Sequence, residues 1–185
     1  MTDFIFTQIL DLAIDRGDLS FLIGIWQGGD QSQREYIQSE LPRLGRSLGI
    51  PGVTNFHKLV DAYYQSLVDQ AGLTYDSEDY HEILSLVIEN NSIPFAKFVL
   101  DQLTVIIDGG DLPTELAEDL SDEIEDKAVR VIREKKNDLF HLFYGYQVFI
   151  NESIDAETDV SGYINVAKMT GNQEILDFFG SDDVR

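Results

Sequence analysis

Apolar residues recur at every third or fourth position along most of this chain, and this spacing strongly limits its possible folds. Between Phe4 and Arg16, for example, one face of a helix carries Ile5, Ile9, Leu12 and Ala13. Each apolar run is short, because a glycine, an asparagine pair or a proline follows it. The pattern predicts an all-α fold built from many short helices.

Capping and stop signals divide the chain into helices joined by short turns. Asp18 is expected to cap the second helix. A third helix is expected to begin after Asp30 and to end or bend at Pro42. Residues 45–53 are expected to form a loop. The segment 103–107 fits either a short strand or a continued helix, because five β-branched and apolar residues do not separate the two. Further helices are expected near residues 56–71, 77–89, 92–103, 113–135, 138–146, 163–169 and 174–179.

Three segments of the chain match one another: residues 10–22, 84–96 and 164–176. In each, a small residue lies four positions before a glycine or asparagine, and apolar residues follow at fixed offsets; the pairs are Ala13 with Gly17, Val87 with Asn91, and Ala167 with Gly171. Each segment resembles the helix-turn-helix of an ankyrin repeat. In that family the small residue lets paired helices approach, and the glycine or asparagine adopts a left-handed turn.

The match to the ankyrin pattern is incomplete. The small residues are 74 and 80 positions apart rather than about 33, the Thr-Pro-Leu-His signature is absent, and Gln173 occupies an apolar position. Any two short amphipathic helices joined by a tight turn would also produce these matches. Both interpretations predict stacked helical hairpins, ankyrin-like or as an irregular α-solenoid, in a single helical-repeat-like domain over residues 1–185.

Acidic residues greatly outnumber basic residues. The chain carries 34 acids and 13 bases, a formal charge of −21, and five of the bases fall within residues 127–136, so the remainder carries −25. Such a surface repels phosphate backbones and anionic membranes, which argues against direct nucleic-acid or membrane binding. The surplus either serves solubility or forms an acidic face for a basic protein partner.

The patterns that usually carry catalysis are missing from the sequence. Cysteine is absent, and His57, His81 and His141 do not have the spacing of a helical zinc site. Asp108-Gly-Gly-Asp111 lacks the alternating acids of a calcium loop, and the glycine pairs lack a phosphate-binding context. We expect no catalytic, cofactor-binding or metal-binding residues, and therefore no enzyme.

Location is inferred from hydropathy and cysteine content. No apolar run approaches the ~18 residues that span a bilayer, and residues 1–8 lack the basic start and apolar core of a secretory signal. The absence of cysteine is consistent with a reducing compartment. We expect a cytoplasmic protein.

One helix after Pro113 concentrates acidic residues and supplies the candidate partner-binding site. Its acids near the positive end of the helix dipole are matched by bases near the other end, so a solvated, dipole-matched face is one interpretation. Pairs from Glu123 to Lys127 and from Asp126 to Arg130 have favourable spacing. A surface for a basic partner is the other interpretation, and the candidate residues are Glu115, Glu118, Asp119, Asp122, Glu123, Glu125 and Asp126.

Two main classes of function follow from these patterns. The first is a non-enzymatic module that binds a basic protein, for instance an immunity or inhibitor protein that neutralises a toxin or nuclease. The second is an enzyme whose clustered carboxylates hold a divalent cation, and a structural or assembly subunit is a third possibility. Salt-sensitive protein binding would favour the first, and stabilisation by magnesium or manganese would favour the second.

Overall fold

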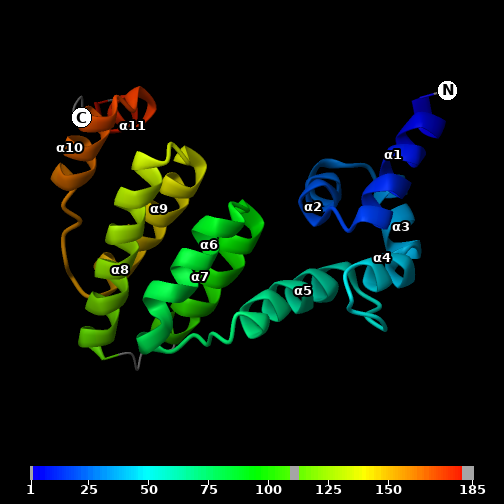
Figure 1. Cartoon of the computed structure of the whole chain (residues 1–185), viewed down its shortest axis with the longest axis horizontal. Helices are drawn as coiled ribbons and strands as arrows, with labels where there is room; N and C mark the ends of the chain where they lie inside the picture. The colour runs from blue at the N-terminus through cyan, green and yellow to red at the C-terminus, as the bar shows by residue number, and fades with distance from the viewer. Residues whose placement is uncertain (1, 109–112, 181–185) are drawn as a thin grey trace. The chain divides into compact units, whose positions relative to one another are not determined.

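The computed structural model describes residues 2–108 and 113–180, and every regular element in these ranges is helical (Figure 1). The all-α prediction is confirmed. The chain divides into two compact units, Met1–Gly72 and Leu73–Arg185, here called the N-terminal and C-terminal units. The expectation of one domain over residues 1–185 stays a prediction, and each unit is described by itself.

The N-terminal unit is built from short helices around one apolar core. Its elements are α1 (Thr2–Arg16), α2 (Leu19–Gly28), α3 (Gln31–Ser39), α4 (Leu41–Ser47) and α5 (Phe56–Gln70). Asp18 caps α2 and α3 begins after Asp30, as the sequence predicts. The structure adds a capping box between Asp30 and Gln33. Leu41 and Pro42 open α4, so residues 45–47 are helical rather than part of the expected loop.

Most of the residues that helix α1 buries differ from those that the apolar spacing indicates. Ala13 of the expected face is buried, together with Leu10 and Ile14, against α2 and α4. The other three expected residues, Ile5, Ile9 and Leu12, are 45–58% exposed. Both stripes of α1 are apolar, so the sequence spacing alone does not show which one is covered.

The C-terminal unit consists of three helical hairpins preceded by a short 3₁₀ turn. Its elements are η1 (Ser77–Asp79), α6 (Tyr80–Asn90), α7 (Ile93–Asp108), α8 (Thr114–Arg133), α9 (Asn137–Ser153), α10 (Ser161–Thr170) and α11 (Gln173–Gly180). Helix α7 continues through residues 103–107, so the strand alternative there is wrong.

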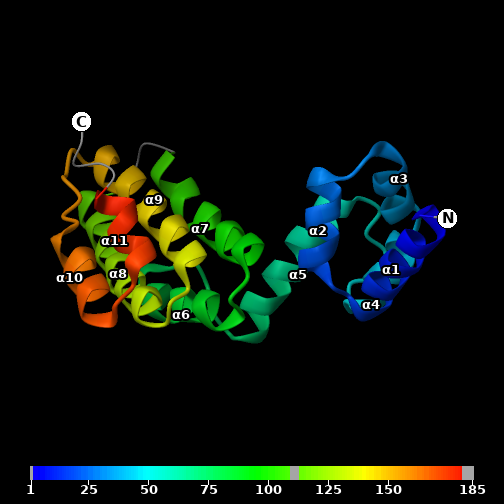
Figure 2. The same cartoon turned by 90° about the horizontal axis from the view of Figure 1, so that it is seen from above.

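Two rows of helices can be followed within the C-terminal unit (Figure 2). The first helices of the hairpins form one row, in which α8 packs against both α6 and α10. The second helices form the other, in which α9 packs against α7 and against the aromatic residues of α11. This order fits the predicted stacking of helical hairpins.

Each of these hairpin turns contains a residue whose backbone is in the left-handed region. Gly17, Asn91 and Gly171 have φ of +63°, +49° and +63°, at the positions that the sequence matches indicate. After Gly17 and Gly171, the next backbone N–H donates to the carbonyl of the small residue, Ala13 or Ala167, at 2.9 Å.

The α8–α9 hairpin uses the same turn, although the sequence did not indicate it. Lys135 has φ of +56°, and the Lys136 N–H donates to the Val131 carbonyl at 2.9 Å. Val131 stands 44 residues after Val87 and 36 before Ala167, so it divides the longer gap between the sequence matches. The resemblance to ankyrin repeats stays a prediction.

Candidate functional site: the acidic face of helix α8

Helix α8 carries all seven candidate partner-binding residues and is held firmly on its opposite side. Its apolar face packs against α9, α10 and α6, and burying that face fixes the helix in place. The side chains buried along this face are Ala117, Leu120, Ile124, Ala128, Val131 and Ile132. The opposite face is thus presented to solvent on a rigid support.

Five of the seven candidate carboxylates share that exposed face. Their spacing of three or four residues places them in one stripe along the helix. In the described ranges, no Lys, Arg or His nitrogen comes within 4 Å of any of them as an ion-pair partner. We call this set the acidic stripe: Glu115, Glu118, Asp119, Asp122 and Asp126.

Glu123 belongs to the edge of α8 rather than to the acidic stripe. It is half-buried, with Oε2 3.2 Å from His81 Nδ1 on α6 and 3.9 Å from Lys127 Nζ. The predicted Glu123–Lys127 ion pair is therefore confirmed. Glu123 contributes to the seam between α6 and α8, and a partner would find its carboxylate already engaged.

Glu125 is likewise engaged, on the side of α8 that faces α9 and α10. Its Oε2 accepts a hydrogen bond of 3.3 Å from Gln147 Nε2, and Gln147 Oε1 in turn accepts from the Tyr163 hydroxyl. Gln147 and Tyr163 are buried, and desolvation, aided by the charge of Glu125, raises the pKa of Tyr163. Glu125 therefore serves this buried network, which holds three helices together.

The bases that follow the acidic stripe do not neutralise it. Arg130 pairs with Glu134 at 2.8 Å, so the expected pair from Asp126 to Arg130 is wrong. Lys136 pairs with the Glu134 carboxylate at 2.7 Å. The hydrogen bond from Lys136, and to a smaller extent the one from Arg130, lowers the pKa of Glu134. Arg130 and Lys136 therefore bind the residue that ends α8, at the turn into α9, and not the acidic stripe.

Lys127 is the one buried base of α8. Its side chain is 3% exposed, and Nζ lies 2.9 Å from His81 Nδ1. Burial lowers the pKa of Lys127, while the nearby charge of Glu123 opposes this shift. The Lys127 ammonium is therefore shielded from solvent, although the charge of Asp126 also acts on it.

A second acidic element, which sequence reasoning missed, extends the stripe toward η1. Tyr80 is buried, and desolvation, followed by the charges of Asp119 on α8 and of Asp76, raises its pKa. The Thr74 hydroxyl lies 2.9 Å from Asp76 Oδ2 and 2.8 Å from Asp79 Oδ2, so these two carboxylates share its one proton, and the Thr74 N–H donates to Asp79 Oδ2 at 3.1 Å. The only sequence signal for this element is the density of acids in residues 76–82.

The structure places no metal-binding cluster within its described residues. No three histidine, aspartate or glutamate side chains in residues 2–108 and 113–180 come together as ligands for an ion. The Asp108–Asp111 segment lies largely outside the described residues. The divalent-metal enzyme stays a prediction that no observation on the described chain supports.

In the described chain, we find no helix with the length and apolar character needed to cross a bilayer. No protein-family model, curated protein or solved structure matches this sequence. The geometry of the chain itself therefore carries the functional argument.

Proposed function

We propose that this chain is a non-enzymatic protein-binding module and that the acidic stripe of α8 binds a basic protein partner. The observation that carries the proposal is the set of five exposed carboxylates on one helical face, none of them in an ion pair within the described chain. Their charge is presented to solvent and remains open to a partner.

The electrostatic setting supports a basic partner. The C-terminal unit holds 25 acids and eight bases, a formal charge of −17, so its long-range field attracts cations. Such a field speeds association and opposes binding to phosphate backbones. The rigid backing of α8 keeps the stripe in one geometry, which reduces the ordering cost of binding.

An immunity or inhibitor protein acting on a basic toxin or nuclease is the biological role that this chemistry suits. The stripe presents negative charge at the helical spacing of α8, and a basic active-site surface would meet it with arginine and lysine side chains. A structural or assembly subunit is the alternative if the surplus charge serves solubility alone. We retain the cytoplasm as the expected location.

The test reverses three stripe charges, in Glu118→Lys, Asp122→Lys and Asp126→Lys. Partners are first isolated from source cells at low salt, and association with the purified partner is then followed by stopped flow at two salt concentrations. We expect slower association and a flatter salt dependence, with a smaller change in dissociation.

A matched control changes the net charge by the same amount elsewhere. Glu89, Glu152 and Glu157 are exposed acids of the same unit that lie off the stripe, so their triple change to lysine alters the total charge equally. If both triple variants slow association alike, net charge rather than the stripe attracts the partner, and the proposal fails.

A further inference from the structure

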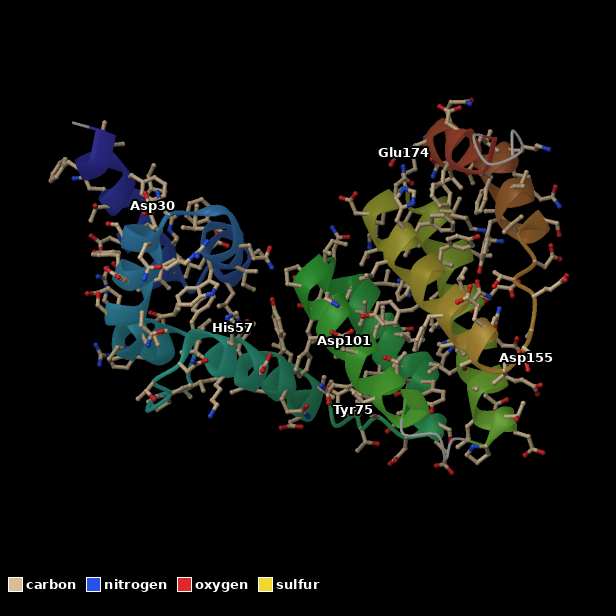
Figure 3. The ribbon with its side chains drawn as sticks, turned by 180° about the vertical axis from the view of Figure 1, so that it is seen from behind. Asp30, His57, Tyr75, Asp101, Asp155 and Glu174 are labelled. Atoms are coloured by element: carbon tan, nitrogen blue, oxygen red, sulfur yellow. The ribbon has the colours of Figure 1, made fainter. Side chains whose placement is uncertain are left out.

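A groove between α7 and α9 is a second surface feature of the C-terminal unit, outside the acidic stripe. It encloses about 390 Å³ and is lined by Asp101 and Thr104 of α7 and by Leu142, Gly145, Tyr146 and Phe149 of α9. Figure 3 labels Asp101 on the green ribbon of α7. The groove combines one carboxylate with apolar and aromatic walls.

The apolar wall of the groove is open to solvent. Phe149 is 40% exposed, and Gly145 is an exposed glycine in the interior of α9. Apart from its chain neighbours and the backbone of α9 itself, no atom lies within 4 Å of the position that a Cβ would occupy there. An interior helical glycine costs about 1 kcal/mol relative to alanine, and nothing within the unit requires it. At Gly145 the absence of a side chain keeps the groove deep.

The polar end of the groove is a carboxylate held in place by a phenol. The Tyr146 hydroxyl donates to Asp101 Oδ1, and burial, followed by this hydrogen bond, raises the pKa of Tyr146. Lys97, one turn earlier on α7, approaches Asp101 Oδ2 at 3.3 Å, but its side chain is 62% exposed. An exposed pair of this kind contributes little, so an incoming cation can compete with Lys97 for Oδ2.

We propose that this groove takes an arginine or lysine side chain of the basic partner, its aliphatic stem on Leu142, Gly145 and Phe149 and its charged head on Asp101. Long basic side chains pair an apolar stem with a cation, which matches the two ends of the groove. The rings of Tyr146 and Phe149 add faces that attract a cation. This inference rests on the proposed function, and it names the contact that would anchor the partner.

The other charged groups around the groove agree with a cationic occupant. His141 borders the groove, and its Nε2 lies 3.7 Å from Glu174 of α11. Lys97 is the only nearby lysine or arginine in the described ranges that pairs with a groove residue, and it pairs with Asp101. With −17 on the unit as a whole, an anionic or neutral ligand gains no such attraction.

The probe is a synthetic amphipathic helical peptide with arginine and leucine on one face, tested against a twin in which each arginine is replaced by its neutral isostere citrulline. Both are titrated into the full-length ¹⁵N-labelled chain, and backbone amide shifts are followed. We expect saturable shifts at Leu142, Gly145 and Tyr146 with the arginine peptide, and binding at least about tenfold weaker with the citrulline peptide.

Three variants sharpen this test. Asp101→Asn keeps an acceptor for Tyr146 but removes the charge, and Gly145→Leu fills the groove; each should weaken the arginine peptide about tenfold. Lys97→Gln removes the competing cation and should strengthen binding. Gly24→Leu on α2 is the control for Gly145→Leu, because Gly24 is also an exposed mid-helix glycine with open space, in the other unit.

The outcomes separate the two proposals. Shifts confined to the acidic stripe, or arginine and citrulline peptides that bind equally, overturn the groove assignment and leave the proposed function standing. Groove shifts that persist unchanged when the three stripe acids are reversed support the groove assignment, and the role of the stripe is then decided by the association rates of the stripe variants. Equal loss in Gly24→Leu and Gly145→Leu would also overturn the groove assignment.

Discussion

The two units of this chain use similar helical hairpins but differ in the size of their acidic surplus and in which acids are paired. The N-terminal unit carries nine acids and five bases, and the C-terminal unit carries 25 and eight. In the first, Arg43 of α4 gathers Asp11 and Asp15 of α1 at 2.8 and 2.6 Å. In the second, the acidic stripe has no ion-pair partner in the described chain. The comparison shows that hairpin construction does not set surface charge.

The units also differ in what they leave exposed. On α1 an apolar stripe of Ile5, Ile9 and Leu12 faces solvent beside Phe4, which is 69% exposed. On α8 the corresponding solvent face is acidic. Burial of one face of a helix therefore does not determine whether its solvent-exposed face is apolar or acidic.

The largest expected effect tests whether the two units are also separate in stability. Phe140 of α9 is fully buried and touches Tyr144, Tyr163 and Phe179, so Phe140→Ala should cost about 3–5 kcal/mol in unfolding of the C-terminal unit. Trp26, the only tryptophan, reports on the other unit. We expect the circular dichroism transition to shift while the Trp26 fluorescence transition stays.

Trp26 is a suitable reporter because of its packing. It is half-buried, stacks on Phe56 with ring centroids 4.5 Å apart, and its Nε1 donates to His57 Nε2 at 3.1 Å. Its native fluorescence should be blue-shifted and should move to longer wavelength on unfolding. A Trp26 transition that shifts together with circular dichroism in Phe140→Ala would show one cooperative unit.

The next effect is a loss of stability of the N-terminal unit at low pH, because Asp11 and Asp15 are paired with Arg43. Hydrogen bonds from Tyr36 and then Arg43 lower the pKa of Asp11, and the hydrogen bond from Arg43 lowers that of Asp15. A lowered carboxyl pKa gives stability that is present above about pH 4 and is lost as pH falls through the folded value. We expect the Trp26 unfolding midpoint to fall on acidification.

Arg43→Met separates this cluster from other acid effects. It keeps an unbranched apolar stem but removes the charge, so the stability lost on acidification should be smaller than in the native chain. At the alkaline end, the Asp11 hydrogen bond raises the pKa of Tyr36 to about 12, and its stabilising effect should disappear as pH rises toward that value. An unchanged acid profile in Arg43→Met would contradict the assignment.

Salt should act on the two units with opposite sign. Screening weakens repulsion among the acids of the C-terminal unit, and it also weakens the Arg43 ion pairs of the N-terminal unit. With added sodium chloride, we expect a higher circular dichroism midpoint for the C-terminal unit and an equal or lower Trp26 midpoint. Equal increases in both would mean that salt acts through burial of apolar surface instead.

The sequence predicted the helical class, the left-handed turns at Gly17, Asn91 and Gly171, and the helix that carries the acidic stripe. It did not predict features that depend on contacts between residues far apart in the sequence. Glu125 has the sequence context of its exposed neighbours, and only the positions of Gln147 and Tyr163 show that it is engaged. The groove at Asp101 and Gly145 joins residues 44 positions apart, so local spacing does not reveal it.

The smallest expected effect concerns the turn that sequence reasoning missed. A lysine in the left-handed region costs about 1 kcal/mol that glycine avoids, and Lys135 occupies the place that Gly171 takes in the next hairpin. Lys135→Gly should therefore stabilise the C-terminal unit by up to about 1 kcal/mol, whereas Gly171→Ala should destabilise it by a similar amount. Circular dichroism unfolding of both variants measures the pair. If Lys135→Gly were destabilising, the Lys135 side chain would have to make contacts that outweigh the backbone strain, and the two turns would not be equivalent.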